Sequence, residues 1–188
     1  MRVIAGQAKG RKLLSVPGEG TRPITDRVKE ALFAILGGAV EGATFLDLFA
    51  GTGAVGIEAL SRGAKRAVFV ERGRQAGRVL RQNLQLTGLA GRAKVVQDDV
   101  FKFISKEKER ESFDFIYVAP PQYKGFWAKT LQALDEALEK SALLAEGGQV
   151  IVQIHPKEYE PLTLKNLALS EQRRYGSTLL CFFERSET

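Results

Sequence analysis

The sequence predicts an α/β fold in which helices cover both faces of a mostly parallel, seven-stranded sheet. Short apolar runs alternate with helical patterns from residue 44 onward, and continuous apolar strands separated by helices are typical of parallel sheets. A glycine-rich segment directly follows the first apolar run. The last two runs are separated by little more than Gly176, which predicts an antiparallel hairpin at the sheet edge.

An extension over residues 1–38 precedes this sheet. Residues 2–6 and 11–16 are β-prone and predict a hairpin with Gly10 at its turn. After a loop, Thr25 can cap a helix by accepting a hydrogen bond from its first turn. The apolar residues of that helix share one face and two glycines end it: Val28, Leu32, Ile35, Leu36, Gly37 and Gly38.

The core over residues 44–188 has the Rossmann-like alternation of parallel strands and helices. Strands are predicted at 44–49, 67–71, 93–97, 113–118 and 149–154, with helices at about 54–62, 73–87, 100–107 and 125–140. Two further strands, over 168–175 and 177–185, form the terminal hairpin. We expect residues 1–188 to form one domain, since a chain of this length can bury a single core.

The composition excludes several classes of protein. A single cysteine, Cys181, allows no intramolecular disulfide, and one histidine with one cysteine gives no ligand spacing for a zinc or iron site. No apolar stretch approaches the length that spans a bilayer, and residues 1–12 lack the apolar centre of a signal peptide. We therefore expect a cytoplasmic protein with neither a metal nor a membrane partner.

The most informative stretch is FLDLFAGTGAVG at residues 45–56. Its glycines let the backbone turn out of a strand and approach a ligand at a helix N-terminus, as in nucleotide sites, although this spacing alone is weak evidence. Glu71 ends the second predicted strand, twenty residues after Gly51, where an acid can accept hydrogen bonds from both ribose hydroxyls. Asp47 suits a ligand with a positive amino-acid end, such as S-adenosylmethionine.

Other unusual residues follow the remaining parallel strands, at the sheet edge where open α/β sheets bind ligands. They are Gln97, Asp98 and Asp99, then Ala119, Pro120 and Pro121, then His155 and Pro156. We expect a structural or surface role for His155. Phe126 and Trp127 are either a substrate platform or core anchors, and core packing is favoured.

The basic charge is concentrated in the extension. Residues 1–29 carry seven basic and two acidic residues, a net +5 of the chain's total of +6. A basic segment beside a nucleotide-type fold predicts contact with a phosphate backbone, the alternative being a solvated surface without a partner. For the arginines after the second strand, Arg72, Arg74, Arg78 and Arg81, a solvated helix face is the favoured interpretation.

Together these motifs resemble the class I S-adenosylmethionine-dependent methyltransferases. More closely, they resemble the RsmD-like family, which methylates the guanine exocyclic amino group in small-subunit ribosomal RNA. The resemblance covers nearly the whole chain and rests on RVIAGQAKGRKL, GTRPITDRVKEALF, LDLFAGTGAVGIEALSRGA, FVER, APPQY and YGSTLLCFF.

The resemblance implies the roles of specific residues. The methionine part of S-adenosylmethionine would lie against Asp47, Phe49, Ala50, Gly51 and Gly53. Glu71 would hold the ribose, with Arg72 beside it. Asp99 and Val100 would contact the adenine edge, although Asp98 is an equally reachable acid. The catalytic turn would comprise Pro120, Pro121, Gln122 and Tyr123. Ribosomal RNA, free or in the small subunit, would contact Arg2, Lys9, Arg11, Lys12 and Arg22.

One departure from the family pattern affects the chemistry. The family motif after the fourth strand begins with Asp or Asn, which holds the protons of the target amino group, whereas this chain has Ala119. We expect Gln122 or the carbonyl of Pro120 to replace that acceptor. Tyr123 is displaced by one position from the family's aromatic residue, so it either stacks on a flipped base or packs under the loop.

Two other functions are compatible with the same fold. Ala119 could mark a catalytically weak or inactive RNA-binding or ribosome assembly factor, but the intact Asp47, Glu71 and Asp99 argue against decay. A nicotinamide-dependent oxidoreductase is disfavoured by Asp47, by the Pro-Pro turn and by the lack of a substrate domain.

Overall fold

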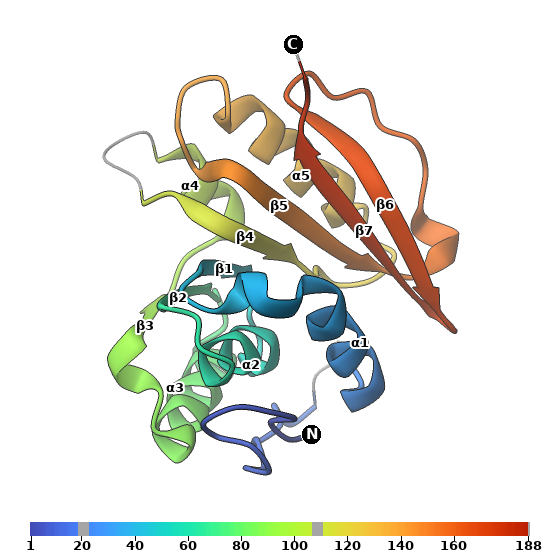
Figure 1. Cartoon of the computed structure of the whole chain (residues 1–188). Coiled ribbons are helices and arrows are strands. Elements are labelled where there is room, and N and C mark those ends of the chain that lie inside the picture. The colour runs from blue at the N-terminus through green and yellow to red at the C-terminus, as the bar shows by residue number, and fades with distance from the viewer. Residues whose placement is uncertain (19–22, 107–110, 188) are drawn as a thin grey trace.

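A seven-stranded sheet in the order β3-β2-β1-β4-β5-β7-β6 forms the centre of the molecule (Figure 1). The structure is a computed structural model that describes residues 1–18, 23–106 and 111–187. Strands β1 to β5 are mutually parallel, and β7 runs antiparallel to both β5 and β6. Their bounds are β1 Thr44–Leu48, β2 Arg66–Val70, β3 Ala93–Val96, β4 Phe113–Val118, β5 Leu144–Ile154, β6 Leu167–Tyr175 and β7 Thr178–Arg185. The predicted fold class is confirmed.

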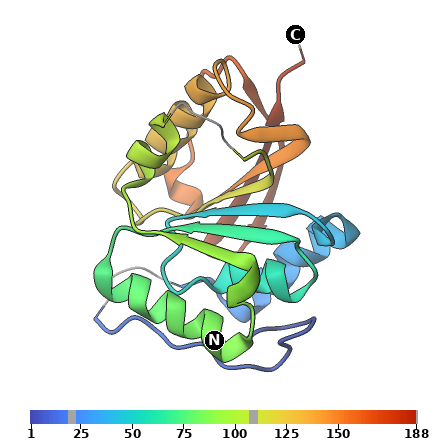
Figure 2. The same cartoon turned by 90° about the vertical axis from the view of Figure 1, so that its left-hand side faces the viewer.

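Helices cover both faces of this sheet (Figure 2). On one face α1 Asp26–Leu36, α2 Ala54–Ser61 and α3 Arg74–Thr87 pack against residues such as Phe45 and Phe115. On the other face α4 Val100–Ser105 and α5 Phe126–Ala137 pack against Leu46 and Leu48. Successive strand residues face opposite sides, so the nearly continuous apolar strands supply both cores. Short 3₁₀ helices lie at Gly37–Val40, Ala90–Arg92 and Pro156–Glu158.

Most element boundaries fall within a few residues of the predicted ones. Thr25 caps α1 as expected, and its hydroxyl oxygen accepts a hydrogen bond from Val28 N at 3.2 Å. The largest difference is β5, which begins at Leu144 instead of residue 149. Leu144 already pairs with Phe113, after which the register shifts and Gly147 adopts a positive φ of 75°. This bulge interrupts the strand just before residue 149, where the predicted strand begins.

The predicted N-terminal hairpin is confirmed in part. The chain turns back with Gly10 at a positive φ of 84°, and Val3 N donates to the Arg11 carbonyl at 2.9 Å and Leu13 N to the Met1 carbonyl at 3.0 Å. Its two segments share a single antiparallel bridge, between Arg2 and Lys12. The backbone N–H groups of Ile4 and Ala5 donate instead to the Glu58 carboxylate on α2, at 2.9 and 3.1 Å. Residues 1–18, called the arm below, are therefore held both by backbone hydrogen bonds between their two segments and by helix side chains.

A buried ion pair fastens the arm to the helical layer. Lys29 Nζ lies 3.3 Å from Glu58 Oε1, and both side chains are fully buried. Lys29 also donates to the carbonyl of Arg2 at 2.6 Å, and Arg62 Nε donates to Glu58 Oε2 at 2.8 Å. Burial lowers the pKa of Lys29, and the Glu58 charge opposes that shift. The single carboxylate of Glu58 thus joins α1, α2 and the arm.

Replacing Glu58 by alanine tests this junction. Glu58→Ala leaves the Lys29 ammonium buried without its partner, so we expect a loss of about 3–5 kcal/mol in the free energy of unfolding, measured by urea denaturation. Adding Lys29→Met should restore part of that loss, because the uncompensated charge is removed. A loss below about 1 kcal/mol for Glu58→Ala, within the range of exposed ion pairs, would contradict the assignment.

Candidate active site

A cavity of about 600 Å³ lies at the carboxyl ends of β1, β2 and β4. Its lining includes nearly all the predicted cofactor residues: Asp47, Phe49, Ala50, Gly51, Glu71, Arg72, Asp98, Asp99 and Val100. Of that set, Gly53 alone lies behind the lining, as the N-cap of α2. The volume is within the usual range of small-molecule sites. The structure therefore brings together the acids that follow three different strands.

The loop between β1 and α2 depends on close packing at its glycines. Gly53 has a φ of 83°, and a Cβ there would lie 2.2 Å from the Leu80 side chain. A Cβ on Gly56 would lie 2.3 Å from the Phe69 ring. Phe49, in the same loop, has a positive φ of 59° without being glycine. Such strained backbone is typical of binding sites, and here it carries a residue that lines the cavity.

Glu71 connects two strand-end loops across the cavity. Its Oε1 accepts a hydrogen bond from Gly51 N at 2.9 Å, and its Oε2 accepts one from Gly73 N at 2.7 Å. A carboxylate offers about four lone-pair positions, so each oxygen can accept a second hydrogen bond. The geometry fits a ligand that presents two adjacent hydroxyls, as a ribose does.

Asp47 is a buried acid at the floor of the cavity. Its side chain accepts a hydrogen bond from Gly56 N at 3.1 Å, and its residue is 2% exposed. Burial raises the pKa of Asp47 well above its usual range; the Gly56 hydrogen bond opposes this shift and the Glu71 charge adds to it. A cationic ligand would relieve the cost of ionising this carboxyl. The ammonium end of S-adenosylmethionine fits that requirement.

The two acids after β3 have different partners. Asp99 caps α4, accepting hydrogen bonds from Phe101 N and Lys102 N at 2.9 and 3.2 Å. Asp98 accepts one from Lys106 Nζ at 2.7 Å, and this bond holds the pKa of Asp98 below its usual range. Both acids line the cavity. Either can therefore meet the adenine end of a nucleoside ligand.

The predicted catalytic turn lies mostly outside the cavity. Ala119 and Pro121 line it, whereas Pro120, Gln122 and Tyr123 do not. The Tyr123 ring contacts His155 at 5.6 Å between ring centroids, and its residue is 64% exposed. Its φ of 61° and a hydrogen bond from its N–H to Glu158 Oε1 at 2.8 Å hold it in that position.

The other aromatic and histidine predictions are partly confirmed. His155 is structural, because its Nδ1 accepts a hydrogen bond from Lys157 N and caps the third 3₁₀ helix. Trp127 is buried in the core as expected. Phe126 differs, since it lines the cavity.

The prediction did not include three polar residues of the site. Tyr117 donates a hydrogen bond to Gln153 Oε1, and both line the cavity beside Ala119. Burial raises the pKa of Tyr117 well above its usual range, so it remains a hydrogen-bond donor. Asn83 on α3 donates to the carbonyl of Thr52 at 3.0 Å and pairs with both backbone groups of Leu14. The only signal for Asn83 was a polar side chain within the apolar stripe of a helix.

Segments of the extension complete the wall of the cavity. They contribute Met1, Ser15, Val16, Pro23 and Ile24. The predicted RNA-contact residues Arg2, Lys9, Arg11 and Lys12 are exposed, while Arg22 lies outside the described residues. Arg11 donates to the carbonyl of Leu86 at 2.9 Å, near the end of α3.

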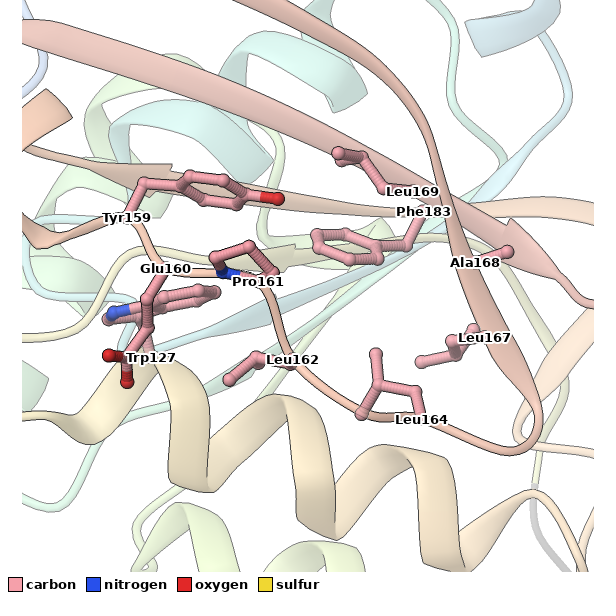
Figure 3. A pocket seen from close by; sticks show the side chains of 10 residues that line it. All are labelled: Trp127, Tyr159, Glu160, Pro161, Leu162, Leu164, Leu167, Ala168, Leu169 and Phe183. Carbon is pink, nitrogen blue, oxygen red and sulfur yellow. The ribbon is translucent and has the colours of Figure 1, made fainter.

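A second cavity, of about 340 Å³, lies between α5, the segment after β5 and the terminal hairpin (Figure 3). Figure 3 shows mainly apolar side chains facing it, with Trp127 and Tyr159 stacked at 5.8 Å between centroids. It lacks the cluster of acids found in the first cavity. Among the described residues there is no group of three or more potential metal ligands and no helix long and apolar enough to cross a membrane.

Comparison with known proteins identifies the family. The family model described as Conserved hypothetical protein 95 matches residues 1–184. The chain belongs to this family. Ribosomal RNA small subunit methyltransferase D of Escherichia coli K12 is 33% identical over 98% of this chain and 90% of its own length. The protein of the same name from Haemophilus influenzae is 34% identical over 93% of each chain.

Solved structures agree with this assignment. Escherichia coli yhhF superimposes with a TM-score of 0.82 at 33% identity and covers 98% of this chain and 97% of its own. The Thermus thermophilus protein TTHA0928 gives a TM-score of 0.77 at 35% identity, covering 97% and 98%. The predictions of the family, of a methyltransferase and of S-adenosylmethionine as its cofactor are confirmed.

The raised pKa of Asp47 leads to a pH-dependent prediction. A cationic ligand favours the ionised carboxyl, so binding of S-adenosylmethionine should release a proton and weaken as the pH falls below that raised pKa. Asp47→Asn should bind about 10- to 100-fold more weakly, because a charged hydrogen bond contributes about 1.5–3 kcal/mol, and should lose this pH dependence. Calorimetry in buffers of different ionisation enthalpy measures both quantities. Equal proton release by wild type and Asp47→Asn would contradict the role of Asp47.

Proposed function

We propose that the protein transfers a methyl group from S-adenosylmethionine to the exocyclic amino group of a guanine in small-subunit ribosomal RNA. The observation that supports this most is one cavity that holds Asp47, Glu71 and Asp99 and is walled by the basic extension. The printed names of the Escherichia coli and Haemophilus influenzae relatives support the class of RNA. The target base itself is inferred from the family resemblance.

The cofactor residues keep the roles that the sequence suggested. Asp47, with Phe49, Ala50, Gly51 and Gly53, would hold the amino-acid end, while Glu71 and Arg72 would hold the ribose. Asp99 with Val100, or Asp98, would meet the adenine. S-adenosylmethionine supplies an electrophilic methyl group when bound. The protein's own contribution is to align an amino nitrogen with that group, since alignment alone can provide on the order of 7–11 kcal/mol.

The acceptor that Ala119 lacks is best supplied by Gln153. Val118 pairs with Val152, so continuing the register places Ala119 beside Gln153 at the sheet edge. Gln153 lines the cavity, whereas Gln122 does not. Tyr117 occupies one lone pair of Gln153 Oε1 and fixes the amide, which leaves a second lone pair for an amino proton of the substrate. The Pro120 carbonyl, the other acceptor suggested by the sequence, belongs like Gln122 to a residue outside the cavity lining.

We expect Gln153→Ala to lower kcat by about 10²-fold, the usual cost of removing one preorganised hydrogen bond at a reacting group. The Kd for S-adenosylmethionine should stay unchanged, because the cofactor residues are untouched. Gln122→Ala is the matched control and should keep the wild-type rate. Adding Ala119→Asn to Gln153→Ala should recover part of the loss. A normal kcat for Gln153→Ala, or a slow Gln122→Ala, would assign the acceptor differently.

The function itself is tested by methyl transfer from labelled S-adenosylmethionine. The substrates are ribosomal RNA and small ribosomal subunits lacking base methylation, and nucleoside mass analysis identifies the product. A methylated guanine with the label on its amino nitrogen is the expected result. Intact cofactor binding without transfer to either substrate would support the second candidate, a weak or inactive assembly factor, which Ala119 in the cavity wall favours.

A further inference from the structure

We propose that the exposed face of helix α3 is an RNA-backbone contact surface that links the active-site cavity to the basic arm. This surface, called the α3 ridge, consists of Arg74, Arg78 and Arg81. The inference rests on the proposed function, because it assumes that the partner is RNA with one base in the cavity. It replaces the interpretation of these arginines as a solvated helix face without a partner.

The position of α3 gives the first argument. Gly73, the residue before the helix, lines the cavity, and the 14 residues of α3 extend about 21 Å away from it. The ridge arginines are spaced by four and three residues, so they share one face. All three are exposed, while Val79, Leu80 and other residues of the opposite face are buried. The ridge therefore begins at the cavity mouth and runs outward.

The arm gives the second argument, because its cations lie at the far end of α3. Arg11 contacts Leu86 in the last turn of α3, Leu14 pairs with Asn83, and Ser15 lines the cavity. The arm thus runs along α3 in the opposite direction, and Figure 2 shows the two side by side. An RNA that has a base in the cavity and also contacts Lys9 or Arg11 can follow the ridge between these two points.

The charge pattern gives the third argument. Residues 72–97 contain six basic residues and no acidic one. Within the described parts of the chain, no acidic side chain pairs with a ridge arginine. Like charges four residues apart destabilise a helix, and so does a cation in its first turn, where Arg74 lies. The three arginines therefore do not stabilise the helix, and this favours a role in binding an anionic partner.

RNA fits this surface better than an acidic protein does. The ridge is a single row of arginines with exposed Gln75, Gln82 and Gln85 between and beside them. Arginine and amide side chains are the usual donors to phosphate and sugar oxygens. The row also leads to a cavity whose chemistry requires a base, so the backbone attached to that base must leave along some surface of the protein.

The test compares two charge-reversal variants of the full chain. Arg78→Glu with Arg81→Glu reverses the ridge, and both positions are exposed, so folding should be maintained; the carboxylate at position 78 can pair with Arg74, four residues earlier. Lys140→Glu with Lys165→Glu is the control, because both lysines are exposed on the α5 side of the sheet. Binding to a small-subunit ribosomal RNA fragment is measured by fluorescence anisotropy from low to moderate salt. Thermal melting and the Kd for S-adenosylmethionine monitor the fold.

We expect the ridge variant to bind RNA at least tenfold more weakly at low salt. The slope of log K against log salt should become shallower by about 0.7–0.9 for each lost phosphate contact. Arg78→Lys with Arg81→Lys should keep that slope, and the control variant should match wild type. An unchanged slope for the ridge variant would overturn the proposal, as would an equal loss in the control. The same measurement with small ribosomal subunits is a further check: a loss seen with the subunits but not with the RNA fragment would also overturn the proposal, since the partner would then be a ribosomal protein.

The two proposals fail in different ways. Absence of guanine methylation by the wild-type protein would reject the proposed reaction, while the anisotropy measurements would still decide whether the ridge binds RNA. Normal methylation together with unchanged binding by the ridge variant would reject the ridge alone. A wild-type protein without salt-dependent RNA binding would reject the ridge whatever its catalytic activity.

Discussion

The arrangement of the site depends on the buried carboxylate of Glu58. That group takes N–H donors from the arm and the charges of Lys29 and Arg62, so the arm, α1 and α2 hold one another in place. The same helix α2 begins at the glycine loop that lines the cavity. Removing either partner of a buried ion pair leaves an uncompensated charge, so the stability of this junction depends on both Lys29 and Glu58. The arm is therefore part of the cavity wall and not a flexible appendage.

A second constraint is the electrostatic cost of placing Asp47 and Glu71 close together at one edge of the sheet. Asp47 is deeply buried, and the Glu71 charge helps to raise its pKa. Glu71 is held in place by hydrogen bonds from two backbone N–H groups. The burial of Asp47 opposes folding, because a buried carboxyl is costly to ionise. In the proposed function, a ligand with a cationic end and neighbouring hydroxyls would satisfy both Asp47 and Glu71.

The sequence predicted the sheet, the helices and the acids that line the cavity because these depend on local pattern: apolar runs, glycine spacing and acids at the ends of the first three strands. The N-terminal hairpin pairs over a shorter length than predicted, because the hydrogen-bond partners of Ile4 and Ala5 lie on Glu58, over fifty residues away. Gln153 was missed for a related reason. Its proximity to Ala119 follows from the pairing of β4 with β5, and no local pattern specifies that register.

The register between β4 and β5 also explains how the site could tolerate alanine at position 119. A side-chain acceptor lost at the end of β4 can be replaced from the end of β5, because neighbouring parallel strands lie about 4.8 Å apart. Gln153 can act there only if its amide is fixed, and Tyr117 fixes it by donating to Oε1. The raised pKa of Tyr117 keeps that donor protonated, and burial is the main cause of the shift. A neutral amide held by a neutral phenol accepts a hydrogen bond without adding charge beside Asp47 and Glu71. The substitution at Ala119 is therefore compatible with an active enzyme whose acceptor has moved by one strand.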